Sequence, residues 1–454
     1  MLNWESMIYA LPEDVLKRKW AGDFEGEIEL IDEMLARDIP AFLKKRLQVE
    51  RFIAERLPKE YIYSRDEALA LMREKIPDFR DEELDLLEMD RAVEYIYVKG
   101  EKRYHSSFRS TILNVKADYA RRAGRENAPS DPDLNETMHE MKQKGTLAYR
   151  IRLKGTLKIT EESFVYRAPV LCYLPIPRPG AQISDVRVEP CAASLDKEDA
   201  PQRTALFHRS SEGNEPFVIE YSYTDRMHFV DLLSGEAPAH PVYPDVPAPT
   251  ADDLGEQLPH IAFTPALREL ARELMGEERD KVHIAWRFYD FITTHIQYSY
   301  MRSYALIENQ AEYCALSGKG DCGIQALLFI TLCRIAGIPA RWQSGLSVDR
   351  KDAGCHDWAQ FYVEPWGWVF CDPSYGGSAR RKGFEERRRF YFGNLDPFRM
   401  VANCRYQTQF NPPVSWPRLD PYDNQSGEVC VGGRGLGRGE FETDYETLEL
   451  TRLD

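Results

Sequence analysis

The fold of this chain is decided by residues 318–341, which read GKGDCGIQALLFITLCRIAGIPAR. A glycine-rich turn ends at Asp321, and an apolar run continues to Gly337-Ile338-Pro339, a pattern typical of the end of a helix. The stretch therefore predicts a buried helix whose first turn carries Cys322. Free N–H groups and the positive end of the helix dipole stabilise a thiolate at that position. We expect the pKa of Cys322 to lie below the usual ~8.5, and the same N–H groups to be able to receive an oxyanion.

A second stretch, residues 354–373, reads GCHDWAQFYVEPWGWVFCDP and supplies what a thiolate nucleophile needs. It predicts two antiparallel strands joined by a tight turn, with His356 at the start of the first strand and Asp372 at the end of the second. Such a hairpin places the two side chains next to each other. A nucleophile requires a proton carrier, and the carrier requires a group that holds its tautomer, so Cys322, His356 and Asp372 form a candidate triad.

Two other interpretations of this region stay open at the level of sequence. The chain has nine cysteines, and five of them fall between positions 314 and 371. A zinc site with Cys355, His356 and Cys371 as ligands would explain this crowding, although no CxxC or HxxxH spacing supports it. The aromatic residues around the hairpin could line a groove for a peptide or sugar-bearing ligand, or they could pack in the core; these are Trp358, Tyr362, Trp366, Trp368 and Tyr375.

Together these motifs resemble the transglutaminase-like superfamily, whose core is a papain-like cysteine fold. The resemblance rests on Gly-Asp-Cys opening a helix that ends in Gly-Ile-Pro-Ala-Arg, then His-x-Trp, then Trp-Val-x-x-Asp-Pro, and it covers roughly residues 262–376. It implies Cys322 as nucleophile, His356 as general base and acid, and Asp372 as the residue that orients the imidazole. The β-rich segment before the core looks like the accessory sandwich of bacterial members.

The departures from the family pattern bear on the reaction. Asp321 and Gly323 flank the cysteine where crosslinking transglutaminases carry Gln and Trp, and Gln360 stands where many relatives have an acidic residue. The resemblance therefore favours a hydrolase, either a protease or an amidase, that acts on amide bonds through a thioester. The alternatives are an amine-accepting transglutaminase and a non-enzymatic protein-binding module that keeps the fold. The side chain that completes the oxyanion hole stays open among Tyr298, Tyr300 and Tyr313.

Outward from the core, changes in periodicity predict a multi-domain α+β protein. Helical spacing dominates the N-terminal region, period-2 alternation begins near residue 146, and prolines recur at intervals of two or three from Pro238 to Pro249. An SH3-type ligand in the proline-rich stretch is less favoured than a spacer, because no basic residue flanks it. The predicted parts are a helical region (1–143), an antiparallel β-sandwich (144–235), a proline-rich linker (236–260), a transglutaminase-like core (261–400) and a β-rich C-terminal extension packed on the core (401–454).

The amino-acid composition limits the classes of partner that we expect this protein to bind. The 454 residues include 59 Lys+Arg and 74 Asp+Glu, a formal net charge of −15. Nucleic acids and anionic membranes require clustered basic residues, so we expect neither as a partner and expect a peptide or protein amide as substrate. No export signal or membrane span is evident, and an odd number of cysteines without a CxxC pair favours reduced thiols and a cytoplasmic location. The sequence implies no metal or organic cofactor.

Overall fold

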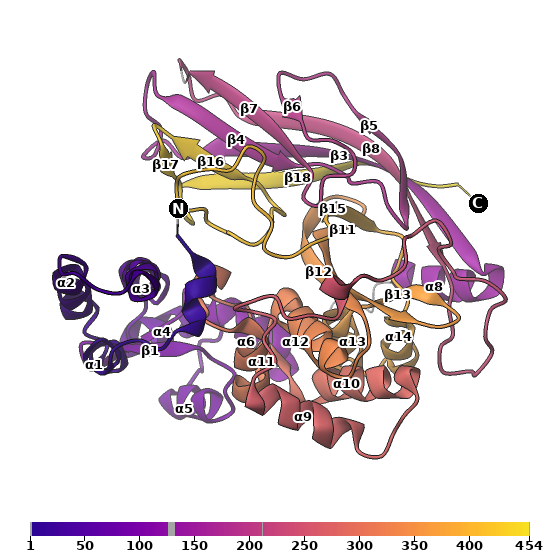
Figure 1. Cartoon of the computed structure of the whole chain (residues 1–454), viewed down its shortest axis with the longest axis horizontal. Coiled ribbons are helices and arrows are strands. Elements are labelled where there is room, and N and C mark those ends of the chain that lie inside the picture. The colour runs from indigo at the N-terminus through magenta and orange to yellow at the C-terminus, as the bar shows by residue number, and fades with distance from the viewer. Residues whose placement is uncertain (1, 126–131, 211, 454) are drawn as a thin grey trace.

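The computed structural model describes residues 2–125, 132–210 and 212–453 of the chain, and in these residues helices and mainly antiparallel sheets are combined (Figure 1). A group of N-terminal helices, a two-sheet sandwich and a core of helices around a third large sheet lie against one another. The predicted α+β class is confirmed. None of the helices in the described ranges is long and apolar enough to cross a bilayer.

The N-terminal region is mainly helical and contains one β-hairpin. Its elements are η1 (Trp4–Ile8), α1 (Glu13–Ala21), α2 (Phe24–Leu35), α3 (Ala41–Glu60), α4 (Arg65–Arg73), α5 (Asp81–Met89), β1 (Tyr95–Val98), β2 (Glu101–Tyr104), α6 (Phe108–Val115) and α7 (Ala117–Arg122). Apolar side chains of α3 pack with Ala305 and Leu306 of the core. Glu94 is buried, forms an ion pair with Arg302 and accepts a hydrogen bond of 2.9 Å from Tyr313 Oη. These contacts fasten the region to the segment that precedes Cys322.

Two antiparallel sheets form the sandwich. The sheets have the orders β17-β16-β4-β7-β6 and β18-β3-β8-β5. The elements are α8 (Pro132–Lys144), β3 (Thr146–Ile159), β4 (Pro169–Pro175), β5 (Ile183–Val188), β6 (Ser194–Leu195), β7 (Thr204–Ser210), β8 (Phe217–His228), β16 (Glu428–Val431), β17 (Arg434–Gly435) and β18 (Phe441–Arg452). Alternation along β3 puts Leu147, Ile151 and Leu153 into the core, as period-2 patterning predicts.

The end of the chain differs from the expected arrangement. Strands β16 and β18 pair with β4 and β3, so they belong to the sandwich sheets and are not simply packed on the core (Figure 1). β18 follows β3 from Phe441 opposite Ile159 to Arg452 opposite Tyr149. The reason is that β3 and β4 each need a partner for their backbone groups, and strands from the far end of the chain supply it. Such pairing leaves no local signal in the sequence.

The core contains a five-stranded antiparallel sheet of order β14-β13-β12-β11-β15. Its elements are η2 (Ala251–Asp253), α9 (Pro265–Met275), α10 (Lys281–His295), β9 (Gln297–Tyr298), η3 (Tyr304–Leu306), α11 (Gln310–Ser317), β10 (Lys319–Gly320), α12 (Cys322–Ile335), β11 (Ala340–Val348), β12 (Ala353–Val363), β13 (Gly367–Cys371), α13 (Pro373–Arg381), α14 (Glu385–Phe390), β14 (Phe392–Gly393) and β15 (Arg399–Asn403). The segment before the core touches the sheet at the β12–β13 turn, where Val242 N donates to Trp366 O at 2.8 Å and Trp368 Nε1 donates to Pro247 O at 2.9 Å.

Helix α12 is the centre of the core and has the predicted bounds. Asp321 caps it by accepting a hydrogen bond of 3.2 Å from Ile324 N, and the chain leaves the helix at Gly337, whose φ is +70°. Every residue from Gly323 to Arg334 is buried against β11, β12 and neighbouring helices. Each fully buried Leu, Ile or Phe contributes about 1.5–3 kcal/mol, so this helix fixes the position of its first residue, Cys322, firmly in the fold.

Candidate active site

His356 and Asp372 meet across the β12–β13 hairpin, as the sequence predicts. His356 Nε2 lies 2.7 Å from Asp372 Oδ2, and both side chains are buried. Asp372 also begins α13, because its Oδ1 accepts a hydrogen bond of 2.9 Å from Tyr375 N. This second bond fixes the carboxylate, which in turn fixes the imidazole with Nε2 occupied and Nδ1 available for another partner.

A buried guanidinium supports this pair. Arg399, on edge strand β15, is 0% exposed and lies 3.2 Å from Asp372 Oδ2 and 2.7 Å from Asp396 Oδ2. Its guanidinium also lies over the ring of Tyr375, at 4.4 Å, and that ring lies 4.5 Å from the His356 ring. Burial alone would raise the pKa of Asp372, but the hydrogen bond and charge of His356, together with Arg399, hold that pKa below its usual value. Nothing in the motif around Asp372 signals Arg399, which comes from a distant part of the chain.

Cys322 lies at the first position of α12 and is half-buried. Its Sγ donates a hydrogen bond of 3.2 Å to Asp357 Oδ2, and no hydrogen bond joins it to His356 in the described part of the chain. Asp357 is the residue next to His356 on β12, so the sulfur contacts the strand of the predicted base without contacting the imidazole. The structure thus brings His356 and Asp372 into direct contact. Cys322 instead contacts Asp357, the residue that follows His356 on β12.

The expected lowering of the Cys322 pKa is wrong for this arrangement. Burial raises the pKa of the thiol well above its usual value, and the nearby carboxyls of Asp357 and Asp321 raise it further. Asp321 itself is half-buried, and its loss of solvent raises its pKa to about 6. A helix N-terminus is worth about 0.3–1 kcal/mol, or less than one pKa unit, whereas burial and adjacent negative charge can shift a pKa by several units. The local dipole is therefore outweighed.

The absence of a side chain at position 323 has a physical cause. A Cβ on Gly323 would lie 2.3 Å from Tyr304 Oη and 2.8 Å from Asp357 Oδ2. The Tyr304 hydroxyl is held at this position because it donates a hydrogen bond of 2.5 Å to Asp321 Oδ1, at the cap of α12. The position that carries Trp in crosslinking transglutaminases is thus closed here to any side chain by the tyrosine and the aspartate.

Gly323→Ala is therefore expected to displace the Tyr304 hydroxyl or the Asp357 carboxyl and to shift Cys322. A displacement on the scale of 1 Å costs on the order of 10²-fold in rate at a catalytic centre, and kcat/KM measured against a Cys322-dependent substrate checks this value. Gly180→Ala is a matched control, since the nearest atom to a Cβ there is 3.4 Å away. Wild-type kcat/KM in the Gly323 variant would contradict the close packing described here.

A cavity of about 880 Å³ adjoins the His–Asp pair. It lies among the β11–β12 loop, α8, α13 and the end of β18, and its lining includes His356, Tyr298, Tyr300, Tyr375 and Arg381, whereas Cys322 is not among the lining residues. Two of the three tyrosines proposed for the oxyanion hole thus face this space. The third, Tyr313, instead bonds Glu94.

The structure also bears on the two other interpretations of this region, a zinc site and an aromatic groove. Among the described residues, no group of three or more His, Cys, Asp or Glu side chains is arranged to hold a metal ion. Cys371 is fully buried and Cys355 is exposed, while His356 Nε2 is already bonded to Asp372. Of the aromatic cluster, Trp358 and Trp368 are buried in the core, whereas Tyr375 lines the cavity.

A buried helix with a cysteine at its first position, packed on an antiparallel sheet that pairs a histidine with an aspartate, defines a papain-like cysteine fold. Residues 268–373 match the family model of the transglutaminase-like superfamily, so the chain carries a transglutaminase-like domain.

Comparison with curated protein sequences gives no match. Among solved structures, the chain is similar to a candidate cysteine protease from Cytophaga hutchinsonii, with 13% identity and a TM-score of 0.41 over 67% of this chain and 91% of that one. It is also similar to the periplasmic domain of TgpA from Pseudomonas aeruginosa, with 15% identity and a TM-score of 0.28 over 56% and 96% of the two chains.

Proposed function

We propose that this protein is a cysteine hydrolase that cleaves amide or peptide bonds through a thioester on Cys322, with His356 as general base and acid and Asp372 as the residue that orients the imidazole. The observation that carries the proposal is the buried 2.7 Å contact between His356 and Asp372 beside a cavity of about 880 Å³, with Cys322 at the adjoining helix N-terminus. A histidine whose Nε2 is held by a buried carboxylate keeps Nδ1 free to take and return a proton.

The proposed reaction has two halves. Cys322 gives its proton to His356 Nδ1, and the sulfur attacks the carbonyl carbon of a bound amide, whose oxygen becomes an oxyanion near the Cys322 N–H. His356 returns the proton to the amide nitrogen, the C–N bond breaks and the amine leaves. Water then loses a proton to His356 and attacks the thioester, which releases the carboxylic acid and restores the thiol.

Hydrolysis is favoured over crosslinking by the surroundings of the cysteine. Position 323 has no room for the tryptophan of crosslinking enzymes, because Tyr304 and Asp357 occupy that space. We propose a peptide or protein amide as the substrate, since the cavity of about 880 Å³ beside His356 has the size of a ligand-binding pocket. An amine acceptor in place of water would make the same site an acyltransferase.

The choice among hydrolase, acyltransferase and binding module is tested by following one acyl group. A library of peptide and glycopeptide amides is incubated with wild type and with Cys322→Ala, in the presence of a labelled primary amine, and the products are separated by mass. We expect Cys322-dependent products in which acid exceeds amine adduct at least about tenfold. A predominance of amine adduct would identify an acyltransferase, and the absence of any Cys322-dependent product would identify a binding module.

A further inference from the structure

Asp357 is a buried carboxyl for which the proposed reaction has no use, and it makes the only hydrogen bond that the sulfur of Cys322 forms within the described residues. Asp357 is 2% exposed, and its Oδ2 accepts the 3.2 Å bond from Cys322 Sγ. Its Oδ1 accepts a hydrogen bond from Gln425 Nε2, and Gly323 provides the space in which Oδ2 approaches α12. Both oxygens are therefore bound, which fixes the carboxyl against the thiol.

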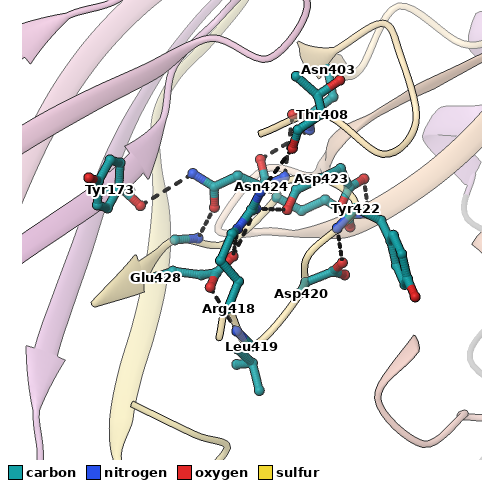
Figure 2. Close-up of polar contacts among 12 residues, drawn as sticks. Tyr173, Asn403, Thr408, Arg418, Leu419, Asp420, Tyr422, Asp423, Asn424 and Glu428 are labelled. Atoms are coloured by element: carbon teal, nitrogen blue, oxygen red, sulfur yellow. Dashed lines mark hydrogen bonds and ion pairs between the residues drawn. The ribbon is translucent and has the colours of Figure 1, made fainter. Parts of the chain in front are cut away.

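Gln425 belongs to a segment that we call the C-terminal strap, residues 404–427, between β15 and β16. Figure 2 shows that the strap is organised around Arg418, which is 2% exposed and donates to Glu428 Oε1 at 2.9 Å and to Thr408 O at 2.9 Å. Asn424 joins the strap to the core and to the sandwich, because its backbone N donates to Asn403 Oδ1 at 3.3 Å and its Nδ2 donates to Tyr173 O at 3.3 Å. The segment is held by buried bonds at both ends.

The strap thereby presents a second carboxyl to the site. Asp423 Oδ2 accepts hydrogen bonds from Ser344 Oγ and, at 3.0 Å, from Gln425 Nε2. The Gln425 amide therefore bridges Asp357 and Asp423. Asp357 lies inside the His-x-Trp motif, but the motif predicts no role for it, and nothing in the sequence connects position 425 with position 357.

We propose that Asp357 is a positioning residue that holds the Cys322 thiol, still protonated, in a resting orientation from which the sulfur must turn to His356 before it reacts. The inference rests on the proposed role of Cys322 as nucleophile. In the resting state the S–H bond is directed at Asp357 Oδ2. When the sulfur turns, the S–H bond breaks, an N–H bond forms at His356 Nδ1, and Asp357 neither gains nor loses a proton.

The charges around Asp357 favour this state. The titratable groups that act on it are Asp321 at the cap of α12 and Cys322 at its first position, Asp420 and Asp423 from the strap, Tyr298 from β9, Tyr304 from η3, and Cys355 on its own strand. Burial raises the pKa of Asp357 well above its usual value, and the carboxyls of Asp423 and Asp321 raise it further. A thiolate would add a negative charge to this buried acidic group, so the thiol keeps its proton while it stays there.

The test is the pH dependence of Cys322 alkylation in the full-length chain without substrate. Iodoacetamide labelling is quantified on the peptide that contains Cys322, because Cys191 and Cys355 are exposed and also react. In wild type we expect an apparent pKa above the ordinary ~8.5, unchanged in His356→Ala. In Asp357→Asn we expect the apparent pKa to fall by at least about one unit, which is about a tenfold rise in labelling rate at pH 7.

Asp423→Asn is the matched control, because Asp423 belongs to the same buried acidic group and does not touch the sulfur. The fall in the apparent pKa of Cys322 should be less than about a third as large in Asp423→Asn as in Asp357→Asn. An unchanged or higher apparent pKa in Asp357→Asn would overturn the inference. If Asp357→Asn does not fold, the comparison of wild type with His356→Ala still tests the inference. An apparent Cys322 pKa below ~7 in wild type that rises in His356→Ala would mean that the sulfur already pairs with the imidazole, and would overturn the inference. A fall in pKa together with full turnover in Cys322→Ala would refute the proposed function, whereas the effect of Asp357 on the pKa of the Cys322 thiol would stand.

Discussion

Replacing Cys322 by alanine is expected to lower kcat toward the best amide substrate by on the order of 10⁴-fold or more, because the covalent step is lost and water alone must attack the amide. The free energy of unfolding should change by less than about 1 kcal/mol, since the side chain is half-buried and its removal leaves the Asp321 cap of α12 in place. Single-turnover kinetics measures the first quantity and urea denaturation the second. The two results together separate a lost reaction from a lost fold.

Two control variants sharpen this expectation. Cys191→Ala removes an exposed thiol and should keep wild-type kcat, so that general thiol effects are excluded. His356→Ala should lower kcat to a similar extent as Cys322→Ala, and the double variant should be little worse than either alone, because residues that act as one unit are strongly non-additive. If Cys322→Ala retained more than about a tenth of wild-type kcat, the thioester route would be wrong.

The sequence predicts those parts of the site that depend on neighbours along the chain. Helix α12 begins at Cys322 because Asp321 caps it, and His356 meets Asp372 because a three-residue turn joins their strands. Both are local consequences of turn and capping chemistry, which the residue order specifies directly.

The contacts that fix the carboxyls of the site join segments that are distant in the sequence, so turn and capping chemistry does not predict them. Arg399 reaches Asp372, and Gln425 reaches Asp357 across 68 positions of sequence. The predicted direction of the Cys322 pKa shift is wrong for the same reason. The helix terminus is visible in the sequence, whereas the burial and the facing carboxyl of Asp357, which outweigh the helix dipole, come from tertiary packing. The pairing of β18 with β3 was likewise hidden, because strand partners leave no local mark.

Arg399→Met should have the largest effect on stability, a loss of about 3–5 kcal/mol in the free energy of unfolding. The guanidinium is 0% exposed and lies between the buried carboxylates of Asp372 and Asp396, so its removal leaves two buried acids with one histidine to balance them. Methionine is chosen because it fills the space of the arginine stem and limits any cavity. Urea denaturation followed by circular dichroism measures the change. Arg51→Met, which breaks an exposed ion pair with Asp32, should cost no more than about 1 kcal/mol.

The pH dependence of that loss tests its electrostatic cause. In wild type the pKa of Asp372 is below its usual value, so this group stabilises the fold above its unfolded pKa, and the contribution is lost as pH falls through the folded pKa. Without Arg399, the Asp372 carboxyl loses one of the causes that lower its pKa while its burial stays the same, so its folded pKa moves upward and the stabilisation that it gives above its unfolded pKa becomes smaller. The deficit of Arg399→Met relative to wild type should therefore be greater at about pH 7, where Asp372 is ionised, than at about pH 3, where this contribution is being lost in wild type as well. An equal deficit at both values would mean that lost packing, and not lost charge, accounts for it, and Asp372 would then need no cation to hold His356.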